Sequence, residues 1–344
     1  MSKISTLIST QIAEIFGSSI EAQNKKIYMA KALDNVKLND LFPKSVVPPQ
    51  GVQSFFHQRI AVTNFLEEAC LILVPHEWCD IQKNQEYLRY LRGISLHLPI
   101  LIFNTGDMSP PVTLKNTIQI RTFLHPGEKN TRKILVPYPV NSRRFKLRDW
   151  NPIPRVGFMG QVPKLRPGSL ISRPKPDIRY PLKSSVYLSR KLSIVRLRRL
   201  EPGISVDLVI RPRFTAIHKN YDLAEHSQEF QDQLFNCDYI LCPRGFGNTS
   251  MRFYEALSAG NTPILVNTEG GLPELNEGQD WNNHILSVNL NEDWKNSILR
   301  DWQILSKGEN YQIRQLSNLK MFNSLLSFDS YMKQLFLDFI EYGG

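Results

Sequence analysis

The residues best suited to chemistry lie in the second half of the chain, in the stretch 237–274. It reads CDYILCPRGFGNTSMRFYEALSAGNTPILVNTEGGLPE. An apolar strand is expected to end at Cys242, followed by a loop with Gly245 and Gly247 and by a helix that begins near Ser250. A glycine loop before a helix lets backbone N–H groups approach a phosphate at the positive end of the helix. The stretch therefore predicts an anion-binding turn.

The side chains around this turn add charge of both signs. Asn248 or Thr249 is expected to cap the helix, and Arg244 and Arg252 supply positive charge. Glu255 lies one helical turn after Arg252, so its carboxylate can accept hydrogen bonds from both ribose hydroxyls of a nucleotide while the arginines hold the diphosphate. The alternative is an ordinary helix cap with a surface Arg–Glu pair, because G-x-G without a third glycine is a weak signal.

Net charge is concentrated in one segment. The chain of 344 residues carries 42 Lys and Arg against 32 Asp and Glu, a net charge of +10, and residues 141–200 alone hold 16 basic residues against two acids. Such a segment is typical of a solvated surface, of a site for an anionic substrate or membrane, or of a nucleic-acid interface. Nucleic acid is the least favoured, because the segment has no zinc-finger, helix-turn-helix or aromatic single-strand-binding pattern.

A metal site is not expected. Cys70, Cys79, Cys237 and Cys242 have no zinc-binding spacing, and no Asp-x-Asp occurs that would suit Mg²⁺ or Mn²⁺. We expect structural thiols, no metal and no cofactor.

The hydropathy pattern excludes a membrane-spanning helix. The longest apolar runs, 69–75 and 98–103, are far shorter than the ~18 residues that a span needs. The first residues lack the uninterrupted apolar core of a signal peptide. The sequence therefore favours a cytoplasmic protein, with peripheral contact to the inner face of a membrane left open.

Short apolar runs alternate with helical segments along the chain. This pattern favours parallel sheets with helices on both faces, in which ligands bind outside the carboxyl ends of the strands. The tail from residue 294 onward is expected to be helical throughout. The strands are expected at 70–75, 98–103, 133–137, 155–160, 206–210, 238–242 and 262–266, and the helices at 84–92, 184–199, 227–234 and 250–258.

The fold class expected is α/β, with two Rossmann-like domains facing across a cleft. The first domain is expected over 1–152 as the acceptor-binding domain, and the second over 153–325 as the nucleotide-binding domain. Residues 326–344 are expected to form a helix that packs back on the first domain. A length of 344 residues fits two hydrophobic cores.

The stretch 242–266 resembles the exostosin-type glycosyltransferase signature, in which C-P-R-G precedes S-x-R-x-x-E-A-L, a glycine and a proline that begins a strand. The run at 272–281, with Leu-Pro and then Trp, and the upstream runs Val-Pro-His-Glu-Trp at 74–78 and Phe-Asn-Thr-Gly-Asp at 103–107 extend the resemblance over roughly residues 65–290. It departs from the eukaryotic members in having no membrane anchor and in carrying Asn-Thr-Gly-Asp where they tend to have a glycine-rich Arg-Asp-His segment. These departures suggest a microbial enzyme.

The resemblance implies a GT-B architecture and transfer of a sugar from a nucleotide-sugar co-substrate without a metal ion, mostly with inversion. Inversion in one displacement needs a base that takes the proton of the acceptor hydroxyl. His76, Glu77 and Asp107 follow expected strand ends of the first domain, and Asp107 ranks first because Gly106 beside it permits close approach of a substrate. Structural roles for all three remain the alternative.

The function expected is thus a glycosyltransferase with a donor, expected to be UDP-linked, and a glycan, polysaccharide or lipid-linked acceptor. The residues expected to bind the donor are Arg244, Gly245, Gly247, Asn248, Ser250, Arg252 and Glu255. Two other classes stay open. A basic nucleic-acid-binding protein would use residues 141–200 as its active surface, and a non-catalytic sugar-binding protein with a GT-B fold would lack the donor residues. The presence of Arg244, Arg252 and Glu255 argues against the second.

Overall fold

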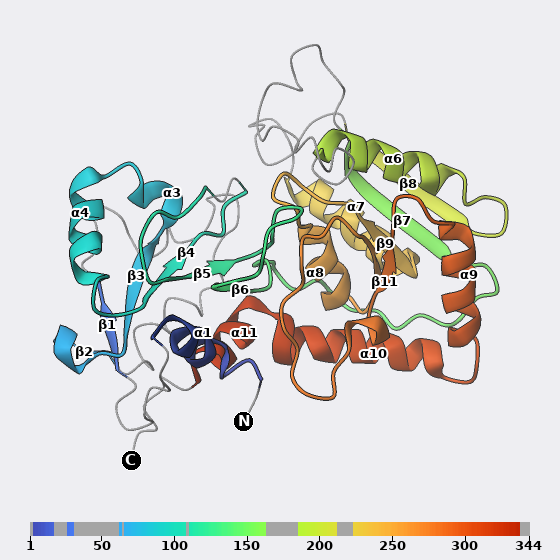
Figure 1. Ribbon diagram of the computed structural model, residues 1–344. Coiled ribbons are helices and arrows are strands. Elements are labelled where there is room, and N and C mark those ends of the chain that lie inside the picture. Colours follow the sequence, from blue (N-terminus) through green and yellow to red (C-terminus); the bar gives the residue numbers. More distant parts are fainter. Residues whose placement is uncertain are drawn as a thin grey trace, which may run out of the picture.

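The structure is a computed structural model that describes residues 3–16, 26–30, 62–63, 65–107, 110–162, 185–211 and 223–337. It contains two sheets in which every pair of neighbouring strands is parallel. Figure 1 shows them side by side, each flanked by helices. The α/β class with two Rossmann-like units is therefore confirmed. No helix among the described residues is both long and apolar enough to cross a membrane.

The first sheet has six strands in the order β2-β1-β3-β4-β5-β6. Helix α4 begins after Asn84, whose side chain accepts a hydrogen bond from the backbone N–H of Tyr87 at 2.9 Å. The elements of this unit are α1 (Leu7–Phe16), β1 (Ile27–Met29), β2 (Val62–Thr63), η2 (Leu66–Glu68), β3 (Leu71–Glu77), α3 (Trp78–Ile81), α4 (Gln85–Ile94), β4 (Ile100–Phe103), β5 (Thr117–Arg121) and β6 (Lys133–Leu135).

The second sheet has five strands in the order β11-β10-β9-β7-β8. Its strands and the helices around them are β7 (Arg155–Gln161), α6 (Val186–Arg198), β8 (Ser205–Arg211), α7 (Leu223–Asn236), β9 (Tyr239–Cys242), α8 (Met251–Ser258), β10 (Thr262–Val266), η4 (Trp281–Asn283), β11 (Leu286–Val288), α9 (Trp294–Leu305), α10 (Asn310–Met321), the π-helical turn η5 (Phe322–Leu326) and α11 (Phe328–Leu335).

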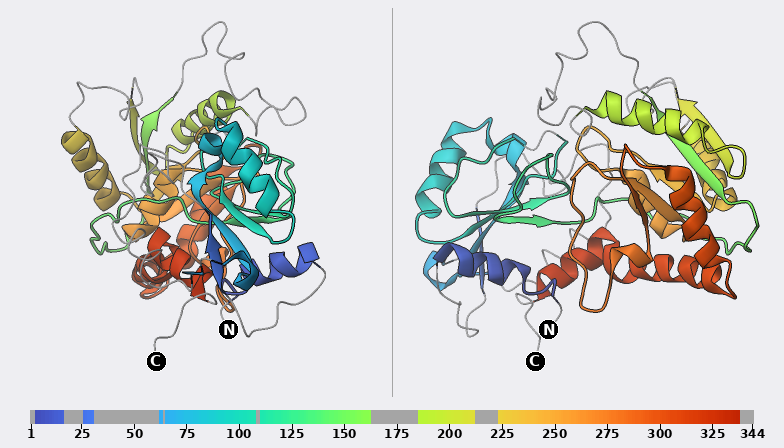
Figure 2. Two further views of the ribbon diagram at one scale, coloured as in Figure 1. Left: turned by 90° about the vertical axis from the view of Figure 1, so that its left-hand side faces the viewer. Right: turned by 45° about the vertical axis from the view of Figure 1, so that its right-hand side comes forward.

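Alternating residues of each strand pack into different cores. In β3, Leu71 and Leu73 join one hydrophobic cluster, and Ile72 and Val74 join another on the opposite face with Trp78. Because side chains of a strand point alternately to the two faces, a strand that is apolar at every position must be covered on both faces. The cluster with Leu71 also contains residues of α1 and α11, which lie close to each other at the junction of the two units (Figures 1 and 2).

Every strand predicted from an apolar run is present, with small changes at its ends. The largest change is in β3, which was expected to end at Pro75 but continues to Glu77. Pairing with β4 shifts register between Leu73 and Glu77, and this irregularity accommodates the proline. The short strands β1, β2 and β11, as well as β5 and α1, were not predicted. The tail is not one continuous helix: α9, α10, η5 and α11 follow one another.

Part of the basic segment is internal. The guanidinium group of Arg148 donates to the hydroxyl of Tyr311 at 3.2 Å and to the carbonyl oxygens of Leu234 and Gly260 at 3.3 Å each. Arg148 thereby links the segment 136–154, which connects the two sheets, to helices α7 and α10 and to the turn after α8. A predicted domain boundary between residues 152 and 153 falls in this connection, which has neither helix nor strand from 136 to 154.

We predict that Arg148→Ala lowers the free energy of unfolding by about 1–3 kcal/mol, because three acceptors around it lose their donor. Arg144→Ala is the matched control in the same connection. The side chain of Arg144 donates to the exposed amide of Gln228 and lies 5.6 Å from the ring centre of Phe235, so its loss should cost at most about 1 kcal/mol. Urea denaturation of both variants measures the difference, and equal losses would contradict the prediction.

Candidate functional site

The predicted anion-binding turn follows the central strand of the second sheet. All four residues of β9 are buried, the loop 243–249 follows, and Ser250 is the N-cap of α8. The expectation that Asn248 or Thr249 caps this helix is wrong, because the helix begins one residue later and the side chain of Asn248 is engaged elsewhere. The loop turns back on itself, with the N–H of Gly245 donating to the carbonyl oxygen of Thr249 at 2.6 Å.

Arg190 of α6 joins the ends of two neighbouring strands. Its Nε donates to the carbonyl oxygen of Arg244 at 2.8 Å, and its Nη1 donates to the carbonyl oxygen of Gln161 at 2.8 Å. Gln161 ends β7 and Arg244 follows β9, and β7 and β9 are paired in the sheet. The strand order reverses direction at this pair, and a crevice outside the carboxyl ends of such a pair is where open α/β sheets bind ligands.

Three guanidinium groups gather here. Burial lowers the pKa of Arg190 to about 10, and the nearby charge of Arg252 adds to the effect. Burial also lowers the pKa of Arg244 to about 10, with a further contribution from Arg190. Like charges at short range thus add to the effect of burial on Arg190 and on Arg244. Glu255 is the carboxylate that contacts this group, through Arg252 at 2.9 Å.

Two pockets open at the carboxyl edge of the second sheet, and Ser250 lines both. We name them the arginine pocket, of about 100 Å³, and the glycine pocket, of about 390 Å³. The arginine pocket is lined by Phe158, Met159, Gly160, Gln161, Arg190, Arg211, His226, Pro243, Ser250 and Arg252. The glycine pocket is lined by Asn248, Thr249, Ser250, Phe253, Leu265, Val266, Asn267, Thr268, Glu269, Gly270, Gly271, Leu272 and Ser287.

Glu255 lies beside these pockets and lines neither. Its Oε1 accepts hydrogen bonds from Arg143, and its Oε2 accepts one from Arg252 at 2.9 Å. Burial by itself would raise the pKa of Glu255, but the two arginines hold it below its ordinary value. Both carboxylate oxygens are thus bound to arginines, and the predicted contact of Glu255 with a ribose stays a prediction.

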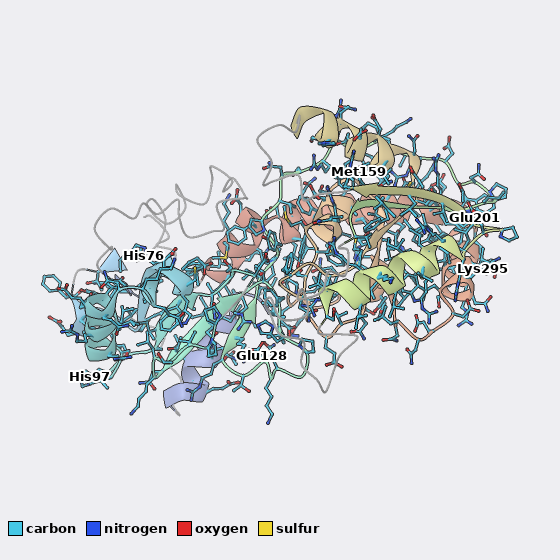
Figure 3. All side chains as sticks on the ribbon, turned by 90° about the horizontal axis from the view of Figure 1, so that it is seen from above. His76, His97, Glu128, Met159, Glu201 and Lys295 are labelled. Atoms are coloured by element: carbon cyan, nitrogen blue, oxygen red, sulfur yellow. The ribbon has the colours of Figure 1, made fainter. Side chains whose placement is uncertain are left out.

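The three candidates for a base have different surroundings. The carboxylate of Glu77 is buried and accepts hydrogen bonds from the N–H of Thr105 at 3.1 and 3.2 Å and from the Thr105 hydroxyl. Burial raises the pKa of Glu77 to about 7. His76 is buried too, with its ring edge on Tyr87 at 5.6 Å between centroids. Figure 3 shows His76 in the first unit, well away from Met159 of the arginine pocket.

Asp107 is the candidate that meets the second unit. It is exposed in the loop after β4, and its carboxylate accepts a hydrogen bond from the N–H of Gly247. Surrounding protein atoms nonetheless raise its pKa above the ordinary value for aspartate, and the hydrogen bond from Gly247 offsets part of this shift. A Cβ atom at position 247 would lie 2.8 Å from Asp107 Oδ1 and 2.6 Å from Phe123, so glycine is required for this close approach.

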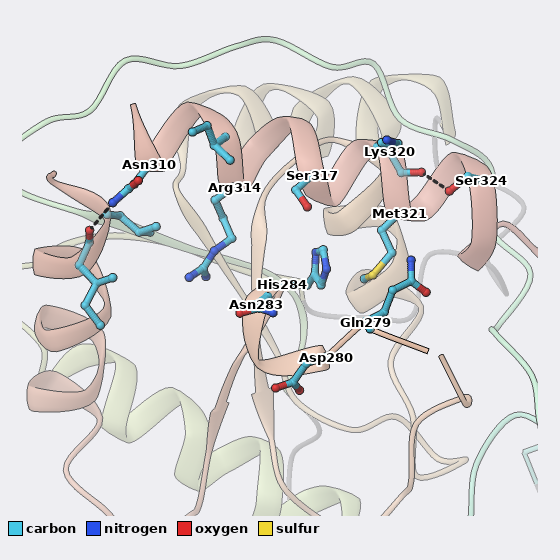
Figure 4. A pocket seen from close by; sticks show the side chains of 14 residues that line it. Gln279, Asp280, Asn283, His284, Asn310, Arg314, Ser317, Lys320, Met321 and Ser324 are labelled. Atoms are coloured by element: carbon cyan, nitrogen blue, oxygen red, sulfur yellow. Dashed lines mark hydrogen bonds between the residues drawn. The ribbon is translucent and has the colours of Figure 1, made fainter. Parts of the chain in front are cut away.

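A further pocket, of about 560 Å³, lies elsewhere. It is enclosed by the loop 278–284 and by α9, α10 and η5, with Arg314 and Ser317 reaching down from α10 toward His284 (Figure 4). It shares no residue with the arginine and glycine pockets. In the described part of the chain, no three or more His, Cys, Asp or Glu residues are grouped so that they could hold a metal ion.

Sequence reasoning missed Arg190. It lies inside the basic segment 141–200, so the excess of charge was the signal, but nothing in the sequence separates Arg190 from its basic neighbours on the same helix. What distinguishes it is the strand order, which brings α6 over the ends of β7 and β9.

No known protein family matches the sequence, and no curated protein does. Among solved structures, the chain is similar to a glycosyltransferase from Rickettsia africae ESF-5, with 9% identity and a TM-score of 0.39 over 92% of this chain and 98% of that one. It is also similar to the C-terminal domain of a glycosyl transferase group 1 family protein from Francisella tularensis, with 12% identity and a TM-score of 0.28 over 55% of this chain and 95% of that one. At this level of similarity the two proteins do not identify the function of the chain, and the resemblance to exostosin-type enzymes stays a prediction.

We predict a pH-dependent difference in stability between the wild type and Glu77→Gln. Because the pKa of Glu77 is about 7 in the fold, against an ordinary value of 4.5, the folded state keeps a proton between these two values that the unfolded state has lost. The contribution of Glu77 to the free energy of unfolding therefore falls as pH rises through this window.

Glutamine does not titrate, so it serves as the reference. Relative to Glu77→Gln, the free energy of unfolding of the wild type should fall by about 2–3 kcal/mol between about pH 5 and about pH 8. Urea denaturation of both proteins at the two pH values measures this. A difference in stability that is the same at both pH values would show that Glu77 has no raised pKa.

Proposed function

We propose that the protein transfers a sugar from a nucleoside-diphosphate sugar to an acceptor hydroxyl, with the donor bound by the second unit. The observation that carries this proposal is the group formed by Arg190, Arg244 and Arg252. Three guanidinium groups held together with one carboxylate leave positive charge that a bound anion would compensate. They lie at the reversal of strand order, where a ligand site is expected in this kind of sheet.

The two pockets suit the two parts of such a donor. The arginine pocket offers Arg190 and Arg252 for a diphosphate, and Ser250 and the start of α8 lie beside it. The glycine pocket has a larger volume and a more apolar lining, with Phe253 and Leu265 on its walls, which suits a nucleoside. Gly245 and Gly247 keep the loop between strand and helix compact, but their N–H groups are bound to the carbonyl oxygen of Thr249 and to the carboxylate of Asp107. The positive charge for the phosphates would therefore come from the arginines.

We propose Asp107 as the base. In an inverting transfer the oxygen of the acceptor hydroxyl forms a bond to the anomeric carbon while the bond from that carbon to the diphosphate oxygen breaks. The hydroxyl proton passes to the Asp107 carboxylate, and the nucleoside diphosphate leaves with the electron pair. A raised pKa suits a carboxylate to this task, and Asp107 accepts a hydrogen bond from Gly247, which belongs to the loop that leads into α8. Glu77 and His76 are both buried in the first unit.

The departing diphosphate gains negative charge, which the arginines and the start of α8 would stabilise without a metal ion. No cofactor is proposed, since the nucleotide sugar is a co-substrate. A glycan, polysaccharide or lipid-linked acceptor, and peripheral contact with a membrane, stay predictions. Nucleic-acid binding remains the less favoured alternative, because Arg143 and Arg148 of the basic segment are bound to groups inside the second unit.

We predict that Arg190→Ala and Arg252→Ala each weaken binding of a nucleoside diphosphate by roughly 10- to 100-fold, as expected when a charged hydrogen-bond donor is lost. Arg198→Ala is the matched control, because Arg198 is exposed on the same helix as Arg190. Calorimetric titrations with uridine and guanosine diphosphates, carried out in EDTA, give the affinities. Binding by the wild type that requires Mn²⁺ would contradict the proposed site, as would equal affinities in all variants.

We predict that Asp107→Asn lowers turnover by roughly 10²- to 10⁴-fold and leaves donor affinity within about threefold, since general-base catalysis contributes about that much. Turnover is measured with a panel of nucleotide sugars and glycan acceptors, and donor affinity by titration. A variant with near-normal turnover would show that another residue is the base.

A further inference from the structure

Backbone groups of one residue, Leu124, make two hydrogen bonds between the two units. Its N–H donates to the carbonyl oxygen of Gly270 at 2.6 Å, and its carbonyl oxygen accepts a hydrogen bond from Nδ2 of Asn248 at 2.8 Å. Leu124 follows β5 in the first unit, and Gly270 and Asn248 belong to loops of the second. Both polar backbone groups of one residue are thus satisfied across the junction.

The Asn248 side chain ties three segments together. Besides Leu124, its Nδ2 donates to the carbonyl oxygen of Thr268 at 3.0 Å. Asn248 is 4% exposed, so neither hydrogen bond competes with bulk water. Because an amide nitrogen has two hydrogens and both are donated to carbonyl oxygens, the orientation of this side chain is fixed.

Glycines make this close approach possible. A Cβ atom at Gly270 would lie 2.2 Å from the carbonyl oxygen of Asn248, and one at Gly271 would lie 2.5 Å from a methyl group of Leu135. Gly271 also has a φ of +72°, which side chains disfavour. The junction is therefore built from positions where the backbone itself makes the contact.

The segment around Leu124 is also held in place by interactions within the first unit. Glu128 accepts a hydrogen bond from the N–H of His125 at 2.8 Å and pairs with Arg121 at 3.3 Å. The N–H of Gly127 donates to Glu269 of the second unit at 3.2 Å. A braced segment transmits a displacement of the second unit to the first instead of absorbing it.

The same junction bears on the proposed site. Asn248 directly follows Gly247, whose N–H binds the carboxylate of Asp107. Asn248, Thr268 and Gly270 are also walls of the glycine pocket. One set of contacts thus fixes both the walls of the proposed nucleoside site and the distance between the proposed base and the loop before α8.

We propose that Asn248 is a positioning residue, which holds the two units together so that Asp107 stays over the donor loop, and that it is not a direct donor contact. This inference rests on the proposed function. Both hydrogens of the Asn248 amide are already bound to carbonyl oxygens, so the group has no hydrogen to offer a phosphate. Its loss should therefore reduce the chemical step more than donor binding.

Asn261 provides a matched control. It is also fully buried, and its Nδ2 also donates to two carbonyl oxygens, those of Leu234 at 3.0 Å and Cys237 at 2.6 Å. Oδ1 of each asparagine is buried with no hydrogen-bond partner among the described residues. The hydrogen bonds of the two side chains differ in where their acceptors lie: those of Asn261 lie in one unit, whereas those of Asn248 lie in two.

The test compares Asn248→Ala and Asn261→Ala in the full-length protein. For Asn248→Ala we expect kcat to fall tenfold or more, donor Kd to change less than threefold, and small-angle scattering of the ligand-free protein to give a larger radius of gyration. For Asn261→Ala we expect lower stability with kcat within threefold of the wild type and an unchanged radius. Asn248→Ser, a smaller change, serves if the alanine variant does not fold.

A rise in donor Kd that accounts for the whole loss of kcat/KM would overturn the proposal, because Asn248 would then be a donor contact. An unchanged kcat, or an equal loss of kcat in Asn261→Ala, would overturn it as well. If the wild type binds no nucleotide, the proposed function fails and the catalytic role of Asn248 fails with it. The scattering result still decides separately whether Asn248 holds the units together.

Discussion

Repulsion between guanidinium groups is the constraint on which the second unit depends. Burying one cation is costly, and placing Arg190, Arg244 and Arg252 together adds their mutual repulsion. The fold offsets this cost with backbone carbonyl oxygens: Arg190 binds those of Gln161 and Arg244, and Arg244 binds that of Phe246 at 3.2 Å. Carbonyl dipoles offset part of this cost and leave the net charge in place, and of the three arginines Arg252 has a carboxylate partner, Glu255.

Strand order decides where this charge lies. In the sheet, β7 pairs with β9, although α6, β8 and α7 lie between them in sequence. This pairing brings the end of β7, the loop after β9 and helix α6 to one edge, and Arg190 spans all three. The first unit meets the second at the adjacent loops, through Asp107 on Gly247 and Leu124 on Gly270. The arginine group and the contact between the units are therefore formed by adjacent loops.

Local patterns were sufficient to predict most of the strands and the turn before α8. Runs such as Tyr239–Cys242 are apolar at every position because they are buried on both faces, so the sequence alone indicates that they are buried strands. The partners of polar side chains could not be predicted in this way. Asn248 was expected to cap a helix, since asparagine favours that position, but a longer-range partner, Leu124, binds its amide instead. Arg190 and Arg148 were two of many basic residues until the fold assigned each to particular carbonyl oxygens.

The two carboxylates of the first unit show how environment separates residues that look alike in sequence. Glu77 and Asp107 each follow the core of a buried strand, and burial raises the pKa of both. Glu77 accepts hydrogen bonds from the backbone and hydroxyl of Thr105, two residues before Asp107, and so fixes the start of the loop that carries Asp107. Asp107 in turn reaches the second unit at Gly247. The carboxylate of Glu77 is therefore satisfied within the first unit, whereas that of Asp107 lies at the junction of the two units. This difference in surroundings is the reason for which we propose Asp107, and not Glu77, as the base.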